Sequence, residues 1–199
     1  PSHPGLEVFY ALETPQKRNG VALVAGDTGQ ALWGHPAETF HVGSGQIADL
    51  DPAHPGCEAW AAEDPKSGAF EGGTPPRWLY SAAGELLAEG QAVPGTTSVV
   101  YWDGDTQREL LRGQPTDFQG GTYPPRIEGR MLAVADITGD WREEIITSVK
   151  GEMRIYTTTI PASDRRVCLM QDPLYRLDVV AAAMGYYQVP MTSYDLATE

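Results

Sequence analysis

The sequence predicts an all-β fold of the propeller type, and three observations lead to this prediction. Glycine and proline are frequent, at 22 and 16 of the 199 residues, which indicates many turns between short strands. The phrase at residues 1–9 recurs at residues 52–60, and this period of 51 residues is the size of one propeller blade. Hairpin-like segments follow at blade-sized spacing, which suits a propeller better than a sandwich.

The repeated phrase consists of Pro-x-His-Pro-Gly followed by a glutamate and an aromatic residue, with Glu7 and Glu58 at matching positions. In the second copy Ile47–Asp51 precedes the phrase, whereas the first copy lacks this half. We therefore expect the chain to begin inside a repeat, with the preceding strand supplied by residues upstream of Pro1. A third, degenerate copy spans Val134–Ile145.

Turn residues separate the individual strands that the sequence predicts. The predicted strands are 20–24 and 30–34 around the turn 26–29, 77–80 and 85–87 around the turn 81–84, and the single runs 97–102 and 154–159. One stretch, Leu174–Met184, is compatible with a helix, and the tail after it is not.

Charge and composition exclude several classes of protein. The chain has 14 Lys+Arg against 27 Asp+Glu, so a phosphate backbone or an anionic membrane would repel it, and we expect neither nucleic acid nor membrane as a partner. The longest apolar stretches, such as Val179–Met184, are too short to span a bilayer. Two free thiols are favoured over a disulfide for Cys57 and Cys168, and no Cys/His cluster has zinc spacing.

Acidic residues recur at repeat positions and indicate calcium sites. Asp49 and Asp51 would face the same side of a strand, and the following turn can bring Glu58 back toward them. Two further groups follow in later repeats: Asp103 and Asp105 with Glu109, and Asp136 and Asp140 with Glu143 or Glu144. Solvated turn acids would explain one such group alone. Because Ca²⁺ prefers carboxylate and carbonyl oxygens, the recurrence favours at least one bound Ca²⁺ ion.

Read together, these segments resemble the rhamnogalacturonan lyases of polysaccharide lyase family 11. The matching phrases, in family order, are Ala48–Pro52 with Pro55–Glu58, Trp102–Asp105 with Arg108–Leu111, Ala135–Glu144, Arg154–Thr158 and Leu169–Leu177. The resemblance implies an eight-bladed propeller, several bound Ca²⁺ ions, secretion, and cleavage of the rhamnogalacturonan I backbone by β-elimination. Residues 1–199 would then form a partial propeller domain of about the last three blades, with the remaining N-terminal blades and pectic polysaccharide as partners.

The resemblance also implies which residues contact substrate. Tyr186, followed by Pro190 and Thr192, matches a family tyrosine at the active cleft and is the candidate catalytic residue. The candidates for binding substrate are Gly121, Thr122, Arg126, His41 and Tyr187. At two positions where the family carries a basic residue, this chain has Ser44 and Tyr123. Either another cation, such as Arg126, Arg130 or His41, takes over, or substrate preference and activity differ.

The expected chemistry explains why these groups matter. β-Elimination from a uronate removes the proton at C5 and expels the oxygen at C4, so the adjacent carboxylate must be neutralised, as Ca²⁺ can do. A base and an acid must move the protons, and tyrosine, arginine or histidine can serve if burial or a cation shifts its pKa. Two other functions stay open: a non-catalytic calcium-stabilised propeller that binds pectic polysaccharide or protein, and a calcium-bridged adhesion module.

Overall fold

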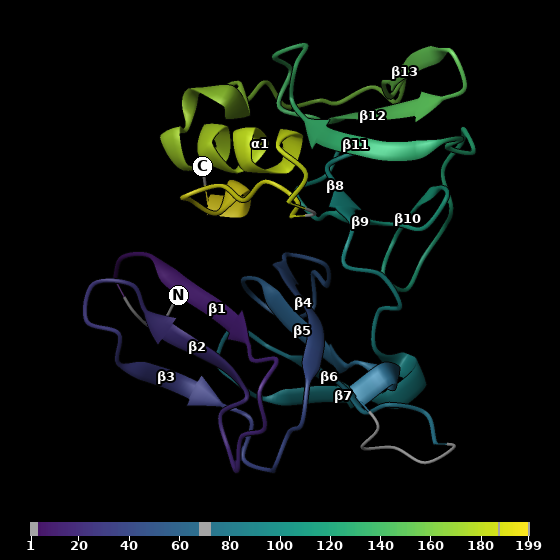
Figure 1. The fold of residues 1–199 in the computed structure, drawn as a ribbon. Coiled ribbons are helices and arrows are strands. Elements are labelled where there is room, and N and C mark those ends of the chain that lie inside the picture. Colours follow the sequence, from purple (N-terminus) through teal and green to yellow (C-terminus); the bar gives the residue numbers. More distant parts are fainter. Residues whose placement is uncertain (1–3, 68–72, 187, 199) are drawn as a thin grey trace. The chain divides into compact units, whose positions relative to one another are not determined.

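The computed structural model describes residues 4–67, 73–186 and 188–198, and the chain divides into two compact units (Figure 1). Unit 1 is Pro1–Thr97 and unit 2 is Ser98–Glu199. Each unit holds two antiparallel sheets, and within every sheet neighbouring strands are consecutive in the chain. This meander connectivity is that of propeller blades, whereas the propeller itself and its number of blades stay predictions.

Unit 1 contains a three-stranded and a four-stranded sheet. The strands of the first are β1 (Glu7–Ala11), β2 (Val21–Ala25) and β3 (Ala31–Gly34), and those of the second are β4 (Val42–Ala48), β5 (Glu58–Glu63), β6 (Arg77–Tyr80) and β7 (Leu86–Glu89). Short 3₁₀ turns occupy Pro65–Ser67 and Gly90–Ala92. The β2–β3 and β6–β7 hairpins confirm the two hairpins predicted from the turn residues.

Aromatic side chains join the two sheets of unit 1. Trp33 of β3 lies with its ring centroid 5.0 Å from that of Tyr80 on β6, and its Nε1 donates to the carbonyl of Ala82 at 3.1 Å. The buried cluster to which these rings belong also contains Val21, Val42, Ala61 and Trp78. Burial of this apolar surface drives the two sheets together, because the hydrophobic effect is proportional to the area removed from water.

The repeat found in the sequence is a repeat of structure. Glu7 begins β1 and Glu58 begins β5, and the glycine two residues before each has a positive φ, 111° at Gly5 and 86° at Gly56. Only glycine adopts this conformation without steric cost, which explains why the phrase carries it in both copies. The repeat prediction is therefore confirmed for the strands that the two phrases begin.

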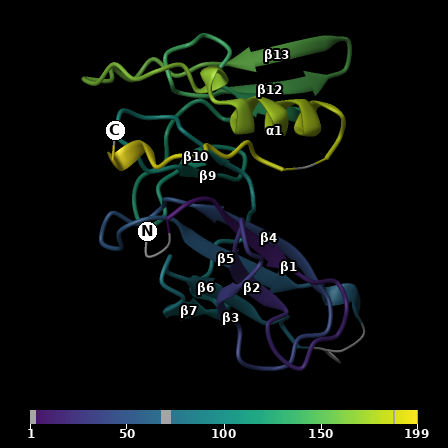
Figure 2. The same ribbon diagram turned by 90° about the vertical axis from the view of Figure 1, so that its left-hand side faces the viewer.

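Unit 2 contains two three-stranded sheets and the single α-helix of the described residues. The strands are β8 (Val99–Val100), β9 (Glu109–Leu111) and β10 (Pro115–Thr116), then β11 (Arg130–Ala135), β12 (Glu144–Val149) and β13 (Glu152–Tyr156), followed by 3₁₀ turn Leu169–Gln171, helix α1 (Pro173–Ala183) and 3₁₀ turn Leu196–Thr198. Figures 1 and 2 show α1 lying against the β11–β12–β13 sheet. The N-cap Asp172 and the proline after it start the helix, which confirms the helix prediction.

The run predicted as a strand at 97–102 is shorter in the structure, because its last residues have other partners. The β8 strand ends at Val100, after which the backbone N–H of Tyr101 donates to Glu143 and that of Trp102 to Glu109. Two side-chain carboxylates thus replace the carbonyls of a neighbouring strand. Within the described ranges, no helix has the length and apolar character to cross a membrane. Cys57 and Cys168 are not joined by a disulfide in the structure.

Candidate metal cluster and substrate-contacting residues

Three acidic turns follow one another along the chain, and from here on they are numbered in chain order: the first copy is Asp49–Glu58, the second is Asp103–Glu109 and the third is Asp136–Glu144. In each of them a buried glutamate follows the turn and accepts hydrogen bonds from its backbone. In the first copy the Oε2 atom of Glu58 accepts from Leu50 N at 2.9 Å and from Asp51 N at 3.0 Å. In the second copy Oε2 of Glu109 accepts from Trp102 N at 2.7 Å. These glutamates therefore close the turn, whether or not a cation is bound.

The third copy is closed by Glu144, and neutral groups satisfy both of its oxygens. Its Oε2 accepts from Ile137 N at 3.0 Å and from Thr138 N at 3.1 Å. Its Oε1 accepts from the hydroxyls of Thr138 and Thr157, at 3.1 and 3.0 Å. Thr138 stands where the first copy has Asp51. In this copy threonine hydroxyls therefore stabilise the buried carboxylate, a role that a bound cation could have among several carboxylates.

The calcium group predicted at Asp136, Asp140 and Glu143 is not gathered in the structure. Asp136 accepts from three backbone N–H groups, and Asp140 pairs with Arg142 at 2.6 Å. Glu143 points instead to the buried Arg108, at 3.4 Å. Of the two alternatives that the sequence offered, Glu144 is thus the repeat-equivalent residue. Nothing in the third copy fits a cation site of these three residues.

The second copy brings together Asp103, Asp105 and Glu109. One ligand oxygen from each lies within 4.8 Å of the others, and within the described parts of the chain this is the only such group of three or more Asp, Glu, His or Cys. Backbone N–H groups hold the turn, since Asp105 N donates to Asp103 Oδ1 at 2.8 Å and Gln107 N donates to Asp105 Oδ1 at 2.9 Å. The structure thus brings together the three carboxylates that the sequence predicted as a calcium group, and the binding of Ca²⁺ there stays a prediction.

The electrostatics of this cluster favour a cation. Burial, together with the nearby charges of Asp103 and Asp105, raises the pKa of Glu109 to about 9. Burial, together with Asp103, also raises the pKa of Asp105. Three clustered carboxylates repel one another, and either protons or a hard cation such as Ca²⁺ relieves the repulsion. The donor set, all carboxylate oxygens, fits such a cation.

The first copy also retains features of a cation site. Asp49 is 7% exposed and Glu58 is fully buried, and burial raises the pKa of Glu58. The Oε1 atom of Glu58 is buried and has no hydrogen-bond partner among the described residues. Asp51 instead accepts from Ala53 N at 2.9 Å and lies 3.2 Å from His54 Nδ1. A buried carboxylate oxygen without a donor is costly, so this copy fits a bound cation or a retained proton.

The predicted substrate turn at Gly121 and Thr122 borders the acidic cluster. Asp117 closes the turn, because its Oδ2 accepts from Gly121 N at 3.1 Å and its N–H donates to Gly121 O at 3.0 Å. Thr122 follows in an isolated bridge to β10. The hydroxyl of Tyr123 lies 2.9 Å from Asp103 Oδ2 and 3.2 Å from Asp117 Oδ2. Asp117 belongs to no repeated phrase, so the sequence alone does not predict its place beside this turn.

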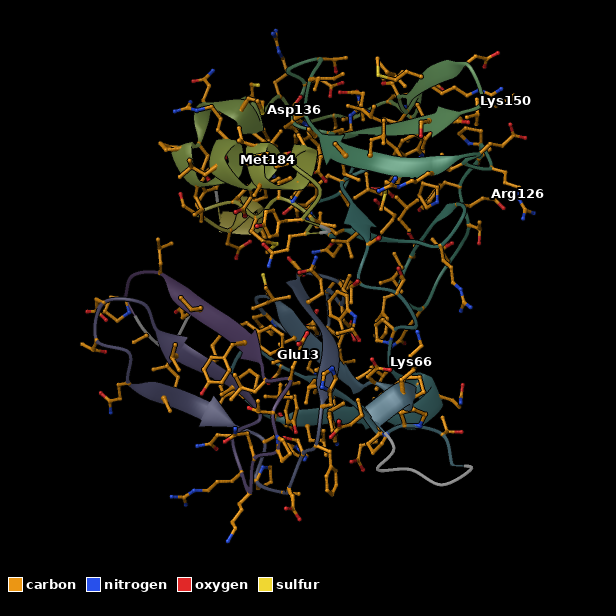
Figure 3. All side chains as sticks on the ribbon, viewed as in Figure 1. Glu13, Lys66, Arg126, Asp136, Lys150 and Met184 are labelled. Carbon is orange, nitrogen blue, oxygen red and sulfur yellow. The ribbon has the colours of Figure 1, made fainter. Side chains whose placement is uncertain are left out.

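Two of the other predicted substrate contacts, Arg126 and Tyr186, lie apart within unit 2. The Tyr186 side chain is 68% exposed, and Met184, two residues earlier, lies on the opposite side of unit 2 from the exposed Arg126 (Figure 3). His41 belongs to unit 1, where its backbone N–H donates to Glu63 at 2.7 Å. Tyr187 lies outside the described residues. Arg126 and Tyr186 therefore do not share a site within unit 2.

Repeated sheets, a buried glutamate in each acidic turn and a carboxylate cluster define a repetitive β-protein suited to hard cations. The model of the C-terminal domain of rhamnogalacturonan lyase family 11 matches residues 1–124 and 125–199. The chain belongs to this family.

Two relatives from Bacillus subtilis (strain 168) match along nearly the whole chain. Rhamnogalacturonan endolyase YesW is 38% identical over 213 residues, and the match covers 98% of this chain and 32% of the relative. Rhamnogalacturonan exolyase YesX is 33% identical over 225 residues, and the match covers 100% of this chain and 35% of the relative. The crystal structure of YesW matches with a TM-score of 0.79 at 37% sequence identity. The structure of a Bacillus licheniformis rhamnogalacturonan lyase matches with a TM-score of 0.80 at 34% identity. Each match covers 98% of this chain and 34% of the solved chain. The chain thus spans about a third of the length of these relatives.

Proposed function

We propose that the protein containing this chain is a secreted, calcium-dependent lyase that cleaves the rhamnogalacturonan I backbone by β-elimination. The observation that carries the proposal is family membership along the whole chain, with 38% and 33% identity to two rhamnogalacturonan lyases. In this proposal the chain contributes the last blades of a propeller, and the rest of the protein contributes the others. Function rests on the site rather than the fold, so the residues must be tested individually.

Tyr186 is the residue that we place in the substrate cleft. Its side chain is 68% exposed, and its backbone is held by a hydrogen bond from Tyr186 N to Ala181 O at 3.2 Å. A phenol can pack against a sugar ring and donate or accept a hydrogen bond through its hydroxyl. An exposed phenol on an ordered backbone is suited to contact the uronate or to move a proton during elimination.

For Ca²⁺ we propose two sites in this chain, the Asp103–Asp105–Glu109 cluster and the Asp49–Asp51–Glu58 turn. Bound there, Ca²⁺ would neutralise carboxylates that are costly to bury with their charge, because burial raises the pKa of both Glu109 and Glu58. We propose no Ca²⁺ site in the third copy, because the hydroxyls of Thr138 and Thr157 already donate to Glu144. These sites stabilise turns, and their role is separate from substrate contact.

The experiment is a lyase assay on the full-length protein with rhamnogalacturonan I. β-Elimination leaves an unsaturated uronide, so the ultraviolet absorbance of the mixture should rise when Ca²⁺ is present. The size of the first products distinguishes cleavage within the chain from cleavage at its end. Folded protein that binds the polysaccharide without forming unsaturated product would replace the lyase by a calcium-stabilised binding propeller, and Tyr123 and Ser44 would then explain the loss of activity.

A further inference from the structure

The segment that carries Tyr186 is short and is held at both ends. It follows α1, where Gly185 has a φ of 99° and Tyr186 N donates to Ala181 O at 3.2 Å. It ends at Val189 and Pro190, which are both buried. Because few residues separate these two anchors, a shift of either anchor would displace Tyr186.

A buried arginine holds the second anchor. Arg108, with a side chain that is 1% exposed, donates from Nη2 to the carbonyl oxygen of Pro190 at 2.7 Å, 82 residues away in the chain. Its guanidinium lies 4.2 Å from the ring centroid of Tyr101. A buried guanidinium is rare without strong partners, since removing its charge from water is costly. The charge of Arg108 therefore needs a partner of opposite charge.

Glu143 is that partner, and it links Arg108 to the first anchor. Its Oε1 lies 3.4 Å from Arg108 Nη2 and accepts the hydroxyl proton of Tyr175 at 2.7 Å. Tyr175 is a fully buried residue of α1, the helix that ends just before Tyr186, and its hydroxyl oxygen also accepts from Asp136 N at 2.9 Å. One network thus contacts α1 through Tyr175 and the segment beyond Tyr186 through Pro190.

Beyond Pro190, other residues hold the tail independently of Arg108. Asp178 accepts from Met191 N at 3.1 Å, and Asp172 accepts from both Ser193 N and Ser193 Oγ. Arg166 donates to the carbonyl of Leu196 and lies 5.7 Å from the Trp141 ring centroid. Arg166 is therefore a matched counterpart of Arg108, because it also joins an aromatic ring to a carbonyl of the tail, but farther from Tyr186.

We propose that Arg108, with Glu143 and Tyr175, is a positioning group for Tyr186. This inference rests on the proposed function, because it concerns the same site. Arg108 does not touch substrate; it fixes the place of Pro190 relative to α1, and with it the place of the Tyr186 hydroxyl. A displacement of about 1 Å can cost about a hundredfold in rate, so a buried anchor four residues from the reacting group affects turnover.

The test uses Arg108→Lys and Arg166→Lys in the full-length protein. Lysine keeps the positive charge but lacks the planar guanidinium, which lies against Tyr101 and whose Nη2 atom reaches both Pro190 O and Glu143 Oε1. We expect Arg108→Lys to lower kcat by about ten- to a hundredfold with little change in KM, and Arg166→Lys to leave kcat within about twofold. Tyr175→Phe, which removes only the hydroxyl, should lower kcat in the same direction while retaining the fold.

Two further measurements separate positioning from general loss of structure. In a Tyr186→Ala background, Arg108→Lys should have no additional effect on kcat, because residues that act through one group are non-additive. Hydrogen exchange of the peptide covering residues 184–192 should be faster in Arg108→Lys and unchanged in Arg166→Lys. Full additivity, or unchanged exchange in Arg108→Lys, would overturn the inference. If the wild type forms no unsaturated product, the proposed function fails, and the exchange experiment alone decides whether Arg108 holds this segment.

Discussion

The phenol oxygen of Tyr123 lies 2.9 Å from Oδ2 of Asp103, a member of the carboxylate cluster. The same oxygen lies 3.2 Å from Asp117, although a phenol has only one proton to donate. Burial and these two acids raise the pKa of Tyr123, so the hydroxyl keeps its proton. A neutral donor thus occupies the position where the family resemblance implies a basic residue, so Tyr123 adds no positive charge beside the carboxylates of the cluster.

The first prediction concerns the charge at position 123. Tyr123→Lys would place an ammonium group beside Asp103 and Asp117, and Coulomb repulsion should weaken Ca²⁺ binding about tenfold or more. Isothermal calorimetry with Ca²⁺ measures the change. Tyr123→Phe is the control, because it removes the hydroxyl without adding charge. Equal Ca²⁺ affinities for the lysine and phenylalanine variants would show that the charge at position 123 does not act on the cation site.

The second prediction distinguishes the repeat copies. A chelator should lower the melting temperature of the wild type, because a ligand bound only to the native state stabilises it, by about 2.7 kcal/mol at a hundredfold excess over Kd. Glu109→Gln should reduce the difference in melting temperature between calcium-bound and chelator-treated protein. Glu144→Gln alters an equally buried glutamate and should keep it, since Thr138 and Thr157 satisfy that copy. If only Glu144→Gln abolished this difference in melting temperature, the third copy and not the second would be the one that binds Ca²⁺.

The third prediction concerns pH in calcium-free protein. Glu109 keeps its proton to about pH 9 when folded, but its ordinary pKa is 4.5, so the folded state binds more protons between these values. The free energy of unfolding should therefore fall as the pH rises from about 5 to about 9, by up to about 1.4 kcal/mol per pH unit. Urea unfolding in chelator at several pH values gives the slope. Glu109→Gln should flatten it, and an unchanged slope would assign the proton elsewhere.

The fourth prediction tests Tyr186 directly. If its hydroxyl moves a proton, Tyr186→Phe should lower kcat by about a hundredfold with little change in KM. If only the ring packs against sugar, Tyr186→Phe should leave kcat and KM nearly unchanged, and Tyr186→Ala should raise KM. Met184→Ala is the control, because this side chain is 74% exposed two residues earlier. Full activity in both Tyr186 variants would remove this residue from the site.

The fifth prediction tests the packing of unit 1. Gly84 has a φ of 84°, and a Cβ atom added there would lie 2.4 Å from Cγ of Trp33. Gly84→Ala should therefore lower the free energy of unfolding by about 2–4 kcal/mol. Gly29 has a φ of 68° but no atom within 4 Å of such a Cβ, so Gly29→Ala should cost only about 1 kcal/mol. Urea unfolding of both variants measures the difference that Trp33 contributes.

Local patterns in the sequence were sufficient for the hairpins, the repeat and the helix. The turn at 26–29, the phrase shared by Glu7 and Glu58, and the run that became α1 each depend on residues close together in the chain. Turn chemistry and strand preference act over that range, so they could be predicted. The length of β8 could not, because its last N–H groups bond to Glu109 and Glu143 instead of to a strand.

The sequence by itself determined which acids recur in each repeat, and tertiary structure decided which of them meet. Glu143 and Glu144 are adjacent, but successive side chains of an extended chain point to opposite sides. Glu144 therefore turns toward Thr138, and Glu143 toward Arg108. The partners of Arg108 are 35 and 82 residues away, at Glu143 and Pro190. No local pattern encodes such contacts, because packing of the whole unit brings those residues together.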